Sequence, residues 1–359
     1  MTDEKYLELY KKYKPKQWND IVGQDKIVAS LRSAVRANKL PVAYLFSGPR
    51  GTGKTSSAKV LAAAINCLSQ DHRAKGEACG ECEICTNIYS DSQLGVNYIS
   101  MANRGGVDEV RKIVDQARLA QPVRKTIWIL DEVHNMSPAA WDSLLIPLES
   151  SSMPSLFVLC STEAHKIPDP IMSRVQARNF RLLPDSELKS FLVAIADEEA
   201  LDLTEEQLDS AVHTGRGSVR DSLTALEAII STGEFADDLG GKLLLSLQSL
   251  NVLEFLKVVG EYAKTGEKFR YLAEDLYSDL RDVLILRAKG GESLIEISPI
   301  DDLAAFKEAI TLAQHLALLE AVGKSVTDMS IGAAEHRIIF EAALLGTIQK
   351  LKRAKRASV

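Results

Sequence analysis

The first half of the chain alternates short apolar runs with longer stretches of helix-forming residues. Apolar residues fill 43–47, 126–130 and 155–160, and polar or helical sequence flanks each run. Runs of this length are typical of strands buried on both faces, and their alternation with helices is the pattern of βαβ units. Residues 1–179 are therefore predicted to form an α/β domain, a parallel sheet with helices on both faces.

After Phe180 the strand pattern stops, and apolar residues recur at helical spacing. Three short helices are predicted within 180–232. The second begins at a capping box formed by Thr204 and Gln207 and ends at Gly215.

The glycine-containing stretch 233–241 is predicted to be a linker, and helical spacing resumes at 243. The chain is therefore predicted to continue as a small three-helix lid at 180–239. An all-α domain is predicted at 240–359.

The composition indicates the broad class of protein but not its function. Hydrophobic residues make up 46% and charged residues 26%, as in soluble globular proteins. The net charge of −6 gives no overall attraction to nucleic acid, although a local basic face could still bind it. The sequence has no run of eighteen apolar residues and no signal peptide at its start, so no membrane contact and a cytoplasmic location are expected.

The stretch GPRGTGKT, from Gly48 to Thr55, matches the phosphate-loop motif G-x-x-x-x-G-K-[ST] in full. It follows a predicted strand and opens a predicted helix, and this context argues against a chance glycine turn. Glycines let backbone N–H groups approach phosphates, Lys54 would reach the β and γ phosphates, and Thr55 would hold Mg²⁺. The predicted nucleotide-binding residues of the loop are Gly48, Pro49, Arg50, Gly51, Thr52, Gly53, Lys54, Thr55 and Ser56.

An acidic pair ends the apolar run in TIWILDEVH. Asp131 is predicted to bind Mg²⁺ together with Thr55, and Glu132 to orient the attacking water. Such a pair is often a solvated turn, but it follows an intact phosphate loop here. The chemistry indicated by these residues is hydrolysis of ATP or GTP.

Cysteines are few and clustered. Four of the five lie at Cys-x11-Cys-x2-Cys-x2-Cys spacing, which favours a metal in a reducing compartment over disulfides. Structural zinc is the leading interpretation because closed zinc sites take four tetrahedral ligands. His72 competes as the fourth ligand, and an iron–sulfur cluster or a redox switch remains an alternative. Cys160 is predicted to be a core residue, and the predicted zinc ligands are Cys67, Cys79, Cys82 and Cys85.

Together these motifs resemble the γ/τ subunit of the bacterial DNA polymerase III clamp loader, an AAA+ ATPase. Further matching stretches are YKKYKPKQWNDIVGQD, GGVDEVRKI, STEAHKIPDPIMSRVQ and GSVRDSL. In this family the cysteines form a zinc module, here 67–85, inserted between the two nucleotide motifs. The chain departs from the family at Lys14 (usually arginine) and Val175 (usually cysteine), and Ile146-Pro147 is expected to break a helix. It also lacks the later domains of the long forms, so a short γ-like form is expected.

The resemblance implies further roles. Arg174 would reach the ATP of a neighbouring subunit and would be catalytic together with Lys54 and Glu132. Each implied residue could instead be an ordinary surface arginine or strand-end hydroxyl, but their order along the chain favours the functional interpretation. The implied nucleotide contacts are Tyr13, Pro15 and Val22 at the adenine, Ser161 and Thr162 at the sensor-1 position, and Arg220 at the sensor-2 position.

The resemblance also implies an ATP-driven motor subunit that helps open a sliding clamp and load it on primer–template DNA. Its cofactors would be ATP, Mg²⁺ and Zn²⁺. Its partners would be other clamp-loader subunits, in a hetero- or homo-oligomeric ring of five ATPase-fold subunits held by the C-terminal collar. Arg104 and Arg111 are candidate DNA-phosphate contacts, near a helix expected to begin at 105–107.

Two alternatives remain open. One is a different AAA+ DNA motor, such as a branch-migration helicase; the zinc module and the Ser173-Arg174 pair argue against it. The other is a ring scaffold that does not hydrolyse ATP; the intact Lys54 and Glu132 argue against that.

Overall fold

The computed structural model describes residues 9–90, 95–102, 104–150, 153–232, 239–265, 269–288, 300–331 and 335–357. The chain separates into two units, Met1–Gly233 and Glu234–Val359, and each is described by itself. Most of the linker predicted at 233–241 lies outside the described residues. The predicted division into domains at 179 and 239 stays a prediction.

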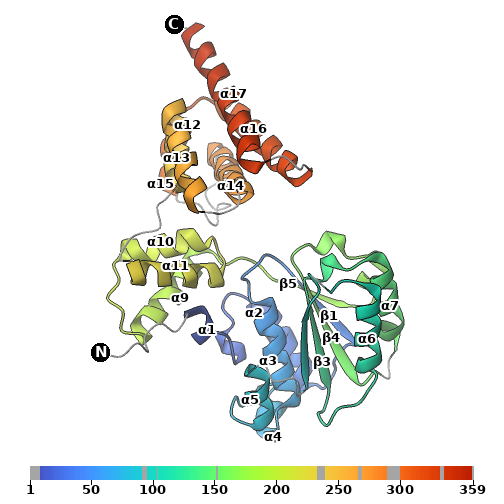
Figure 1. The fold of residues 1–359 in the computed structure, drawn as a ribbon. Coiled ribbons are helices and arrows are strands. Elements are labelled where there is room, and N and C mark those ends of the chain that lie inside the picture. Colours follow the sequence, from blue (N-terminus) through green and yellow to red (C-terminus); the bar gives the residue numbers. More distant parts are fainter. Residues whose placement is uncertain are drawn as a thin grey trace. The chain divides into compact units, whose positions relative to one another are not determined.

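A parallel sheet forms the centre of the first unit (Figure 1). In the described part of the chain it has five strands in the order β2-β3-β4-β1-β5. All four neighbouring pairs are parallel, and they bring the carboxyl ends of β1, β3 and β4 to one edge. The strands are β1 (Ala43–Ser47), β2 (Val96–Ser100), β3 (Thr126–Asp131), β4 (Ser155–Ser161) and β5 (Gln176–Asn179).

The three central strands confirm the strand predictions, since β1 and β4 are buried along their whole length and β3 at every position except Asp131. The two outer strands were not predicted from the sequence. In β2 only Val96 is buried, and β5 reads Gln-Ala-Arg-Asn with no buried residue. Edge strands need no second buried face, so their sequences carry no continuous apolar run.

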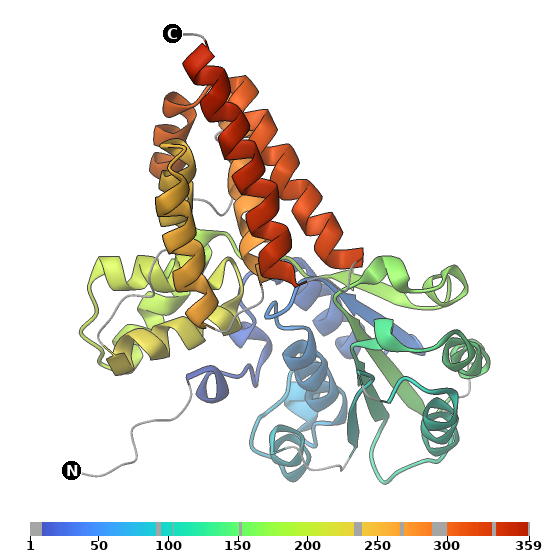
Figure 2. The same ribbon diagram turned by 45° about the horizontal axis from the view of Figure 1, so that its top comes forward.

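Helices cover both faces of this sheet (Figures 1 and 2). Tyr44 and Phe46 of β1 belong to one core cluster, and Ala43 and Leu45 belong to another, because successive side chains point to opposite faces. The first cluster includes residues of α2 (Asp25–Arg36), α3 (Lys54–Asn66) and α5 (Glu83–Tyr89), beside the short α4 (Gln70–Ala74). The second includes residues of α6 (Val107–Ala117), α7 (Pro138–Glu149) and α8 (Asp169–Met172).

Helix α7 corrects one expectation. Residues Ile146 and Pro147 do not break it, and the helix continues to Glu149. Proline in a helix interior removes one i→i−4 hydrogen bond. Here it lies in the last turn, and both Pro147 and Leu148 are buried, so packing retains the helical turn.

The three predicted lid helices are present as α9 (Asp185–Glu198), α10 (Glu205–Gly215) and α11 (Val219–Thr232). The predicted capping box is confirmed. Thr204 accepts a hydrogen bond from the Gln207 N–H at 3.2 Å, and the Gln207 side chain accepts one from the Thr204 N–H at 2.9 Å.

The N-terminal segment packs against this lid. It comprises the single turn α1 (Leu9–Lys12) and the 3₁₀ turn η1 (Trp18–Asp20). Leu9 is buried in the lid core, and Tyr10, Tyr13 and Val22 pack against that core.

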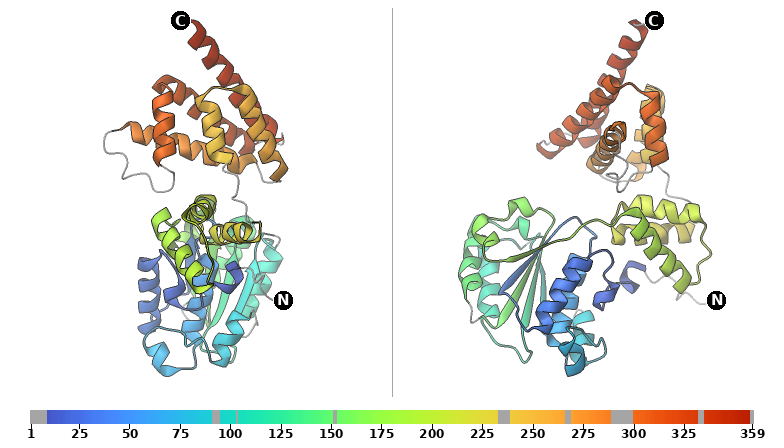
Figure 3. Two further views of the ribbon diagram at one scale, coloured as in Figure 1. Left: turned by 90° about the vertical axis from the view of Figure 1, so that its left-hand side faces the viewer. Right: turned by 180° about the vertical axis from the view of Figure 1, so that it is seen from behind.

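Every described element of the second unit is a helix, as predicted (Figure 3). A core cluster that includes Phe255, Phe306 and Phe340 connects them. None of the described helices is long and apolar enough to cross a membrane. The helices are α12 (Leu239–Gln248), α13 (Val252–Thr265), α14 (Phe269–Arg287), α15 (Ile300–Ala309), α16 (Leu312–Ile331) and α17 (His336–Ala357).

Candidate functional site

The glycine-rich loop connects β1 to α3 and requires its glycines. Gly48, Gly51 and Gly53 have φ angles of 141°, 74° and 92°, a region that side-chain-bearing residues rarely occupy. A Cβ on Gly48 would collide with the carbonyl oxygen of Phe180, and one on Gly51 with the Ser218 hydroxyl. The glycines therefore let the loop lie directly against Phe180, where the chain enters the lid, and against Ser218 of the lid.

Lys54 is the first residue of α3, and its ammonium group lies inside the loop. Nζ donates hydrogen bonds to the carbonyl oxygens of Gly48 at 2.7 Å and Pro49 at 2.6 Å. The side chain is buried, and this burial lowers the pKa of Lys54. A phosphate that entered the loop would find this ammonium beside the N-terminus of α3, two sources of positive potential.

A polar corner forms where β1 and β3 end. Thr55 Oγ1 donates to Asp131 Oδ2 at 2.9 Å, and the Tyr98 hydroxyl donates to the same oxygen at 3.1 Å. The Glu132 N–H donates to Asp131 Oδ1 at 2.9 Å. A hydroxyl beside a carboxylate offers the hard oxygen ligands that Mg²⁺ prefers, so these residues fit the predicted metal position.

Glu132 follows in a strained turn. It is exposed, and its φ of 53° lies in the left-handed region, which is uncommon for residues other than glycine. Strained residues of this kind cluster at functional sites. The turn places an exposed carboxylate one residue after Asp131, where the water-orienting group is predicted.

The predicted sensor-1 residues, Ser161 and Thr162, lie in the same region. The Ser161 carbonyl accepts the Gly48 N–H at 3.2 Å. Ser161 Oγ lies 3.2 Å from His134 Nδ1 and accepts the Glu163 N–H at 3.0 Å. Thr162 follows and is exposed. The end of β4 thus contacts both the phosphate loop and the turn after β3.

The predicted sensor-2 residue lies beside the phosphate loop. Arg220 is in the first turn of α11, and its Cβ would be 3.4 Å from a Cβ built on Gly51. Its guanidinium lies over the Tyr10 ring, 5.0 Å from the ring centre. Arg220 is therefore brought to the loop, with its charge held against an aromatic face of the N-terminal segment.

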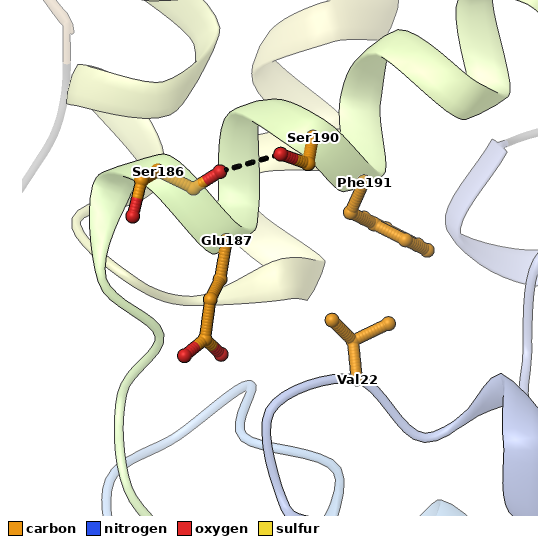
Figure 4. Close-up of a pocket in the computed structure, with 5 residues that line it drawn as sticks. All are labelled: Val22, Ser186, Glu187, Ser190 and Phe191. Atoms are coloured by element: carbon orange, nitrogen blue, oxygen red, sulfur yellow. Dashed lines mark hydrogen bonds between the residues drawn. The ribbon is translucent and has the colours of Figure 1, made fainter.

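The predicted adenine contacts are only partly brought together. Val22 lines a shallow hollow of about 490 Å³ with residues of α9 (Figure 4). The Tyr13 hydroxyl instead donates a hydrogen bond to Glu199. Burial is the larger cause that raises the pKa of Tyr13, and the hydrogen bond to this carboxylate raises it further. Pro15 is half-buried, and neither it nor Tyr13 lines the hollow. The α9 residues that line it are Ser186, Glu187, Ser190 and Phe191.

Arg174 lies at the amino ends of the parallel strands, whereas the phosphate loop of the same chain lies at their carboxyl ends. It precedes β5, whose residue Gln176 pairs with Tyr44, whereas the loop follows Ser47. Three strand residues span roughly 10 Å. Arg174 donates to Glu149 Oε1 at 2.8 Å and to the Pro170 carbonyl at 2.6 Å. The structure does not bring Arg174 to the nucleotide corner of the same chain.

The cysteine cluster forms a four-sulfur centre. The sulfur atoms of Cys67, Cys79, Cys82 and Cys85 all lie within 4.8 Å of one another. In a tetrahedral zinc site with Zn–S bonds of about 2.3 Å, sulfur atoms would be about 3.8 Å apart. The sulfur atoms of Cys79 and Cys85 are 4.0 Å apart. This four-cysteine group does not include His72, whose Nδ1 is 2.9 Å from Ser69 Oγ.

Backbone N–H groups point at these sulfur atoms. The N–H of Leu68 donates to Cys82 Sγ at 3.5 Å, and the N–H of Cys79 donates to Cys67 Sγ at 3.3 Å. Burial raises the pKa values of Cys67 and Cys85. Burial also opposes ionisation of Cys82, but hydrogen bonds from backbone N–H groups and from neighbouring thiols outweigh it and lower the pKa of Cys82 to about 7. Donors of this kind stabilise thiolates, the form that binds metal. Cys160 is instead fully buried within β4, in agreement with a core position.

The candidate DNA contacts lie at the expected helix start. Helix α6 begins at Val107, directly after Gly106. Arg104 and Arg111 are both largely exposed, and their contacts with acidic side chains are long, at 4.0 Å and 3.7 Å. Such exposed pairs are weak, so both guanidinium groups are available to a partner.

A phosphate loop at the carboxyl edge of a parallel sheet, an acidic corner on the adjoining strand and a helical lid beside the loop define a P-loop protein of the AAA+ class. The family model for "DNA polymerase III, delta subunit" matches residues 23–184. The DNA polymerase III subunit tau of Bacillus subtilis is 34% identical over 361 aligned residues, which cover 96% of this chain. Over 96% of its length the chain thus resembles the gamma/tau subunits of DNA polymerase III.

A second relative is the gamma/tau subunit of Mycoplasma pneumoniae, 36% identical over 227 residues and 63% of this chain. The chain spans 63% of the length of the Bacillus subunit and the Mycoplasma alignment spans 33% of that protein. Among solved structures, the Bacillus subtilis clamp loader delta protein has a TM-score of 0.39 at 10% identity, covering 89% of this chain and 99% of that one. A Thermotoga maritima RuvB variant has a TM-score of 0.46 at 15% identity, covering 74% and 85%.

Two contacts of the site were missed by sequence reasoning. Tyr98 lies on β2, a strand that was not predicted, so nothing indicated its position next to Asp131. His134 stands within the DEVH stretch, but its pairing with Ser161 joins residues 27 positions apart. The position of His134 shortly after the Asp131-Glu132 pair, in the Asp-Glu-Val-His sequence, could have indicated a role at the site.

Proposed function

We propose that this chain binds ATP with Mg²⁺ and hydrolyses ATP as a motor subunit of a clamp loader. The observation that supports this most directly is the corner formed by Lys54, Thr55 and Asp131 at the edge of the sheet. The resemblance to gamma/tau subunits gives that corner its context.

In this proposal each residue of the corner has one task. Lys54 exchanges its loop carbonyls for the β and γ phosphates, and Thr55 and Asp131 hold the Mg²⁺, which neutralises phosphate charge. Glu132 orients the attacking water. Further contacts come from Ser161, Thr162 and Arg220 near the γ phosphate, and from Tyr13, Pro15 and Val22 at the base.

Hydrolysis also requires a second subunit in this proposal. Arg174 is too far along the sheet to serve its own loop, so it is available to the nucleotide of a neighbour. Its bonds to Glu149 and to the Pro170 carbonyl hold it in place at the surface. We therefore infer a hetero- or homo-oligomeric ring of clamp-loader subunits, with the C-terminal helical unit as its collar.

Four cysteines are proposed to hold one structural Zn²⁺. The cluster fits this ion because its four sulfur atoms lie within 4.8 Å of one another and those of Cys67 and Cys82 receive backbone N–H donors. The zinc would cross-link a short loop that has little apolar material of its own.

The partners of the proposed motor are a sliding clamp and primer–template DNA. The support is the printed names of the similar proteins, which are subunits of DNA polymerase III. Arg104 and Arg111 are the proposed phosphate contacts. A cytoplasmic location is part of the same proposal.

The first experiment compares ATP binding and turnover of the wild-type chain with those of Lys54→Ala. Loss of this ammonium should abolish turnover and weaken ATP binding at least tenfold, because no other lysine lies in the loop. Lys26→Ala, which changes an exposed lysine on α2, is the matched control and should leave both unchanged. Normal turnover by Lys54→Ala would remove the ATPase assignment.

A further inference from the structure

The cysteine module is packed against the N-terminal segment of the chain. The Trp18 indole Nε1–H donates to the Gly76 carbonyl at 2.8 Å, within the loop between Cys67 and Cys79. The Tyr89 hydroxyl, at the end of α5, donates to the Lys16 carbonyl. Residues 16–18 are thus connected to the module through Trp18, and to α5, the helix that begins within the module, through Tyr89.

Trp18 is also the apolar anchor of this contact. It is 1% exposed and belongs to the same core cluster as Cys67, Cys85 and Ile88, with Tyr89 packed against that cluster. A buried indole that is also hydrogen-bonded has one well-defined position. The place of Trp18 therefore depends on how the module is folded.

A third link joins the module to α2. Gly76 has a φ of 79°, and a Cβ there would collide with the Arg32 carbonyl oxygen. The next residue, Glu77, forms an ion pair with Arg32, and the Glu77 side chain is 17% exposed. The module is thus fitted closely to the segment and to α2, the helix that follows it.

The same segment continues to the hollow beside the lid. Val22 lines that hollow, four residues after Trp18. Gln24 is buried and pairs with the backbone of Arg181, donating to its carbonyl at 2.7 Å and accepting its N–H at 3.3 Å. One end of the segment is therefore fixed by the module and the other by the chain that enters the lid.

We propose that the metal-loaded cysteine module holds residues 13–24 in the position that accepts the base of ATP, with Trp18 and Tyr89 as the positioning residues. This inference rests on the proposed nucleotide site. An inserted module would ordinarily be expected to leave ATP affinity largely intact, and the contacts with Lys16 and Trp18 argue for the opposite.

Metal removal would act through α5. The helix begins at Glu83, directly after Cys82, and carries Cys85 within it, so two of the four ligands fix its position. Without the cross-link, the loop that carries Gly76 and the helix that carries Tyr89 lose their common anchor. Residues 16–18 then lose both hydrogen bonds and part of the pocket for the indole.

The test compares two ligands on the intact chain: ATP, which has a base, and inorganic tripolyphosphate, which can occupy only the phosphate loop. Zinc removal by a chelator should weaken ATP binding about tenfold, and Tyr89→Phe, which keeps all four cysteines, about threefold, as loss of one or two hydrogen bonds implies. Tripolyphosphate affinity should stay the same. Hydrogen exchange should show faster exchange at residues 16–24 in the zinc-free chain.

Tyr44→Phe is the matched control, because the buried Tyr44 hydroxyl has no hydrogen-bond partner among the described residues. It should change neither affinity. Equal ATP affinity with and without zinc would overturn the inference, and so would an equal loss for ATP and tripolyphosphate, which would indicate general destabilisation. A wild-type chain that binds neither ligand would instead refute the nucleotide site itself.

Discussion

Among single residues, Asp131 is the one on which the nucleotide corner depends most. Its two carboxylate oxygens accept three hydrogen bonds, from Thr55, Tyr98 and the Glu132 N–H. Partners that orient a metal-binding carboxylate commonly contribute tenfold or more to metal affinity. Tyr98 has no other polar contact that would explain its position among the described residues, so its role is expected to be orientation of Asp131.

Removal of the Tyr98 hydroxyl should therefore affect magnesium before it affects nucleotide. In Tyr98→Phe, the Mg²⁺ concentration that half-saturates ATP turnover should rise about tenfold, and high Mg²⁺ should restore the rate. ATP binding without Mg²⁺ should not change. The measurement is a magnesium titration of the turnover rate, and an unaltered titration curve would exclude this role of Tyr98.

The individual site residues show what local sequence can and cannot predict. The phosphate loop and Asp131-Glu132 were predicted because their chemistry depends on neighbours along the chain. Tyr98 and the pairing of His134 with Ser161 were not, since they arise from contacts between segments that are distant along the chain. Glu149 as the partner of Arg174 was missed for the same reason, as the two residues are 25 positions apart.

Among the elements, the central strands were predictable and the outer ones were not. Strands β1, β3 and β4 have continuous apolar runs because helices cover both of their faces. Strands β2 and β5 carry polar and exposed residues, and only their pairing in the sheet defines them. The helix break expected at Pro147 was wrong because tertiary packing outweighs the loss of one backbone hydrogen bond.

The cysteine module is the element whose stability depends most on a bound ion. The chain purified without chelator should contain about one zinc per chain, measured by elemental analysis. Cys82→Ser should lose the metal, because it removes one of four thiolate ligands. His72→Ala is the matched control and should keep it, since His72 lies outside the four-sulfur group.

Two results would contradict that assignment. Iron in place of zinc would indicate a cluster of a different chemistry at the same spacing. If Cys82→Ser kept its zinc and His72→Ala lost it, His72 would replace Cys82 as a ligand.

For the whole molecule, the account depends on a nucleotide site shared between subunits. Arg174→Ala should fold and bind ATP normally, because it removes only surface contacts, which contribute little to stability. Its turnover in the assembled ring should fall by about 10³-fold or more, as for other arginines supplied in trans.

Mixing two inactive variants separates trans from cis action. A Lys54→Ala chain still carries Arg174 and can supply it to a neighbour that lacks it. A mixture of Lys54→Ala and Arg174→Ala chains should therefore recover part of the turnover that neither shows alone. Activity that is lost in Arg174→Ala but not recovered on mixing would indicate a role within one chain, and unchanged activity in Arg174→Ala would indicate an ordinary surface residue.

The most direct test of the central claim is the rate of ATP turnover by the complex assembled from this chain and its native partner subunits, measured with and without a sliding clamp and primer–template DNA. A clamp-loader motor predicts that clamp and DNA together raise the rate at least tenfold, and that a complex built with Lys54→Ala shows no stimulation. A rate that is the same with and without clamp and DNA would contradict the clamp-loader account, even if the isolated chain hydrolyses ATP.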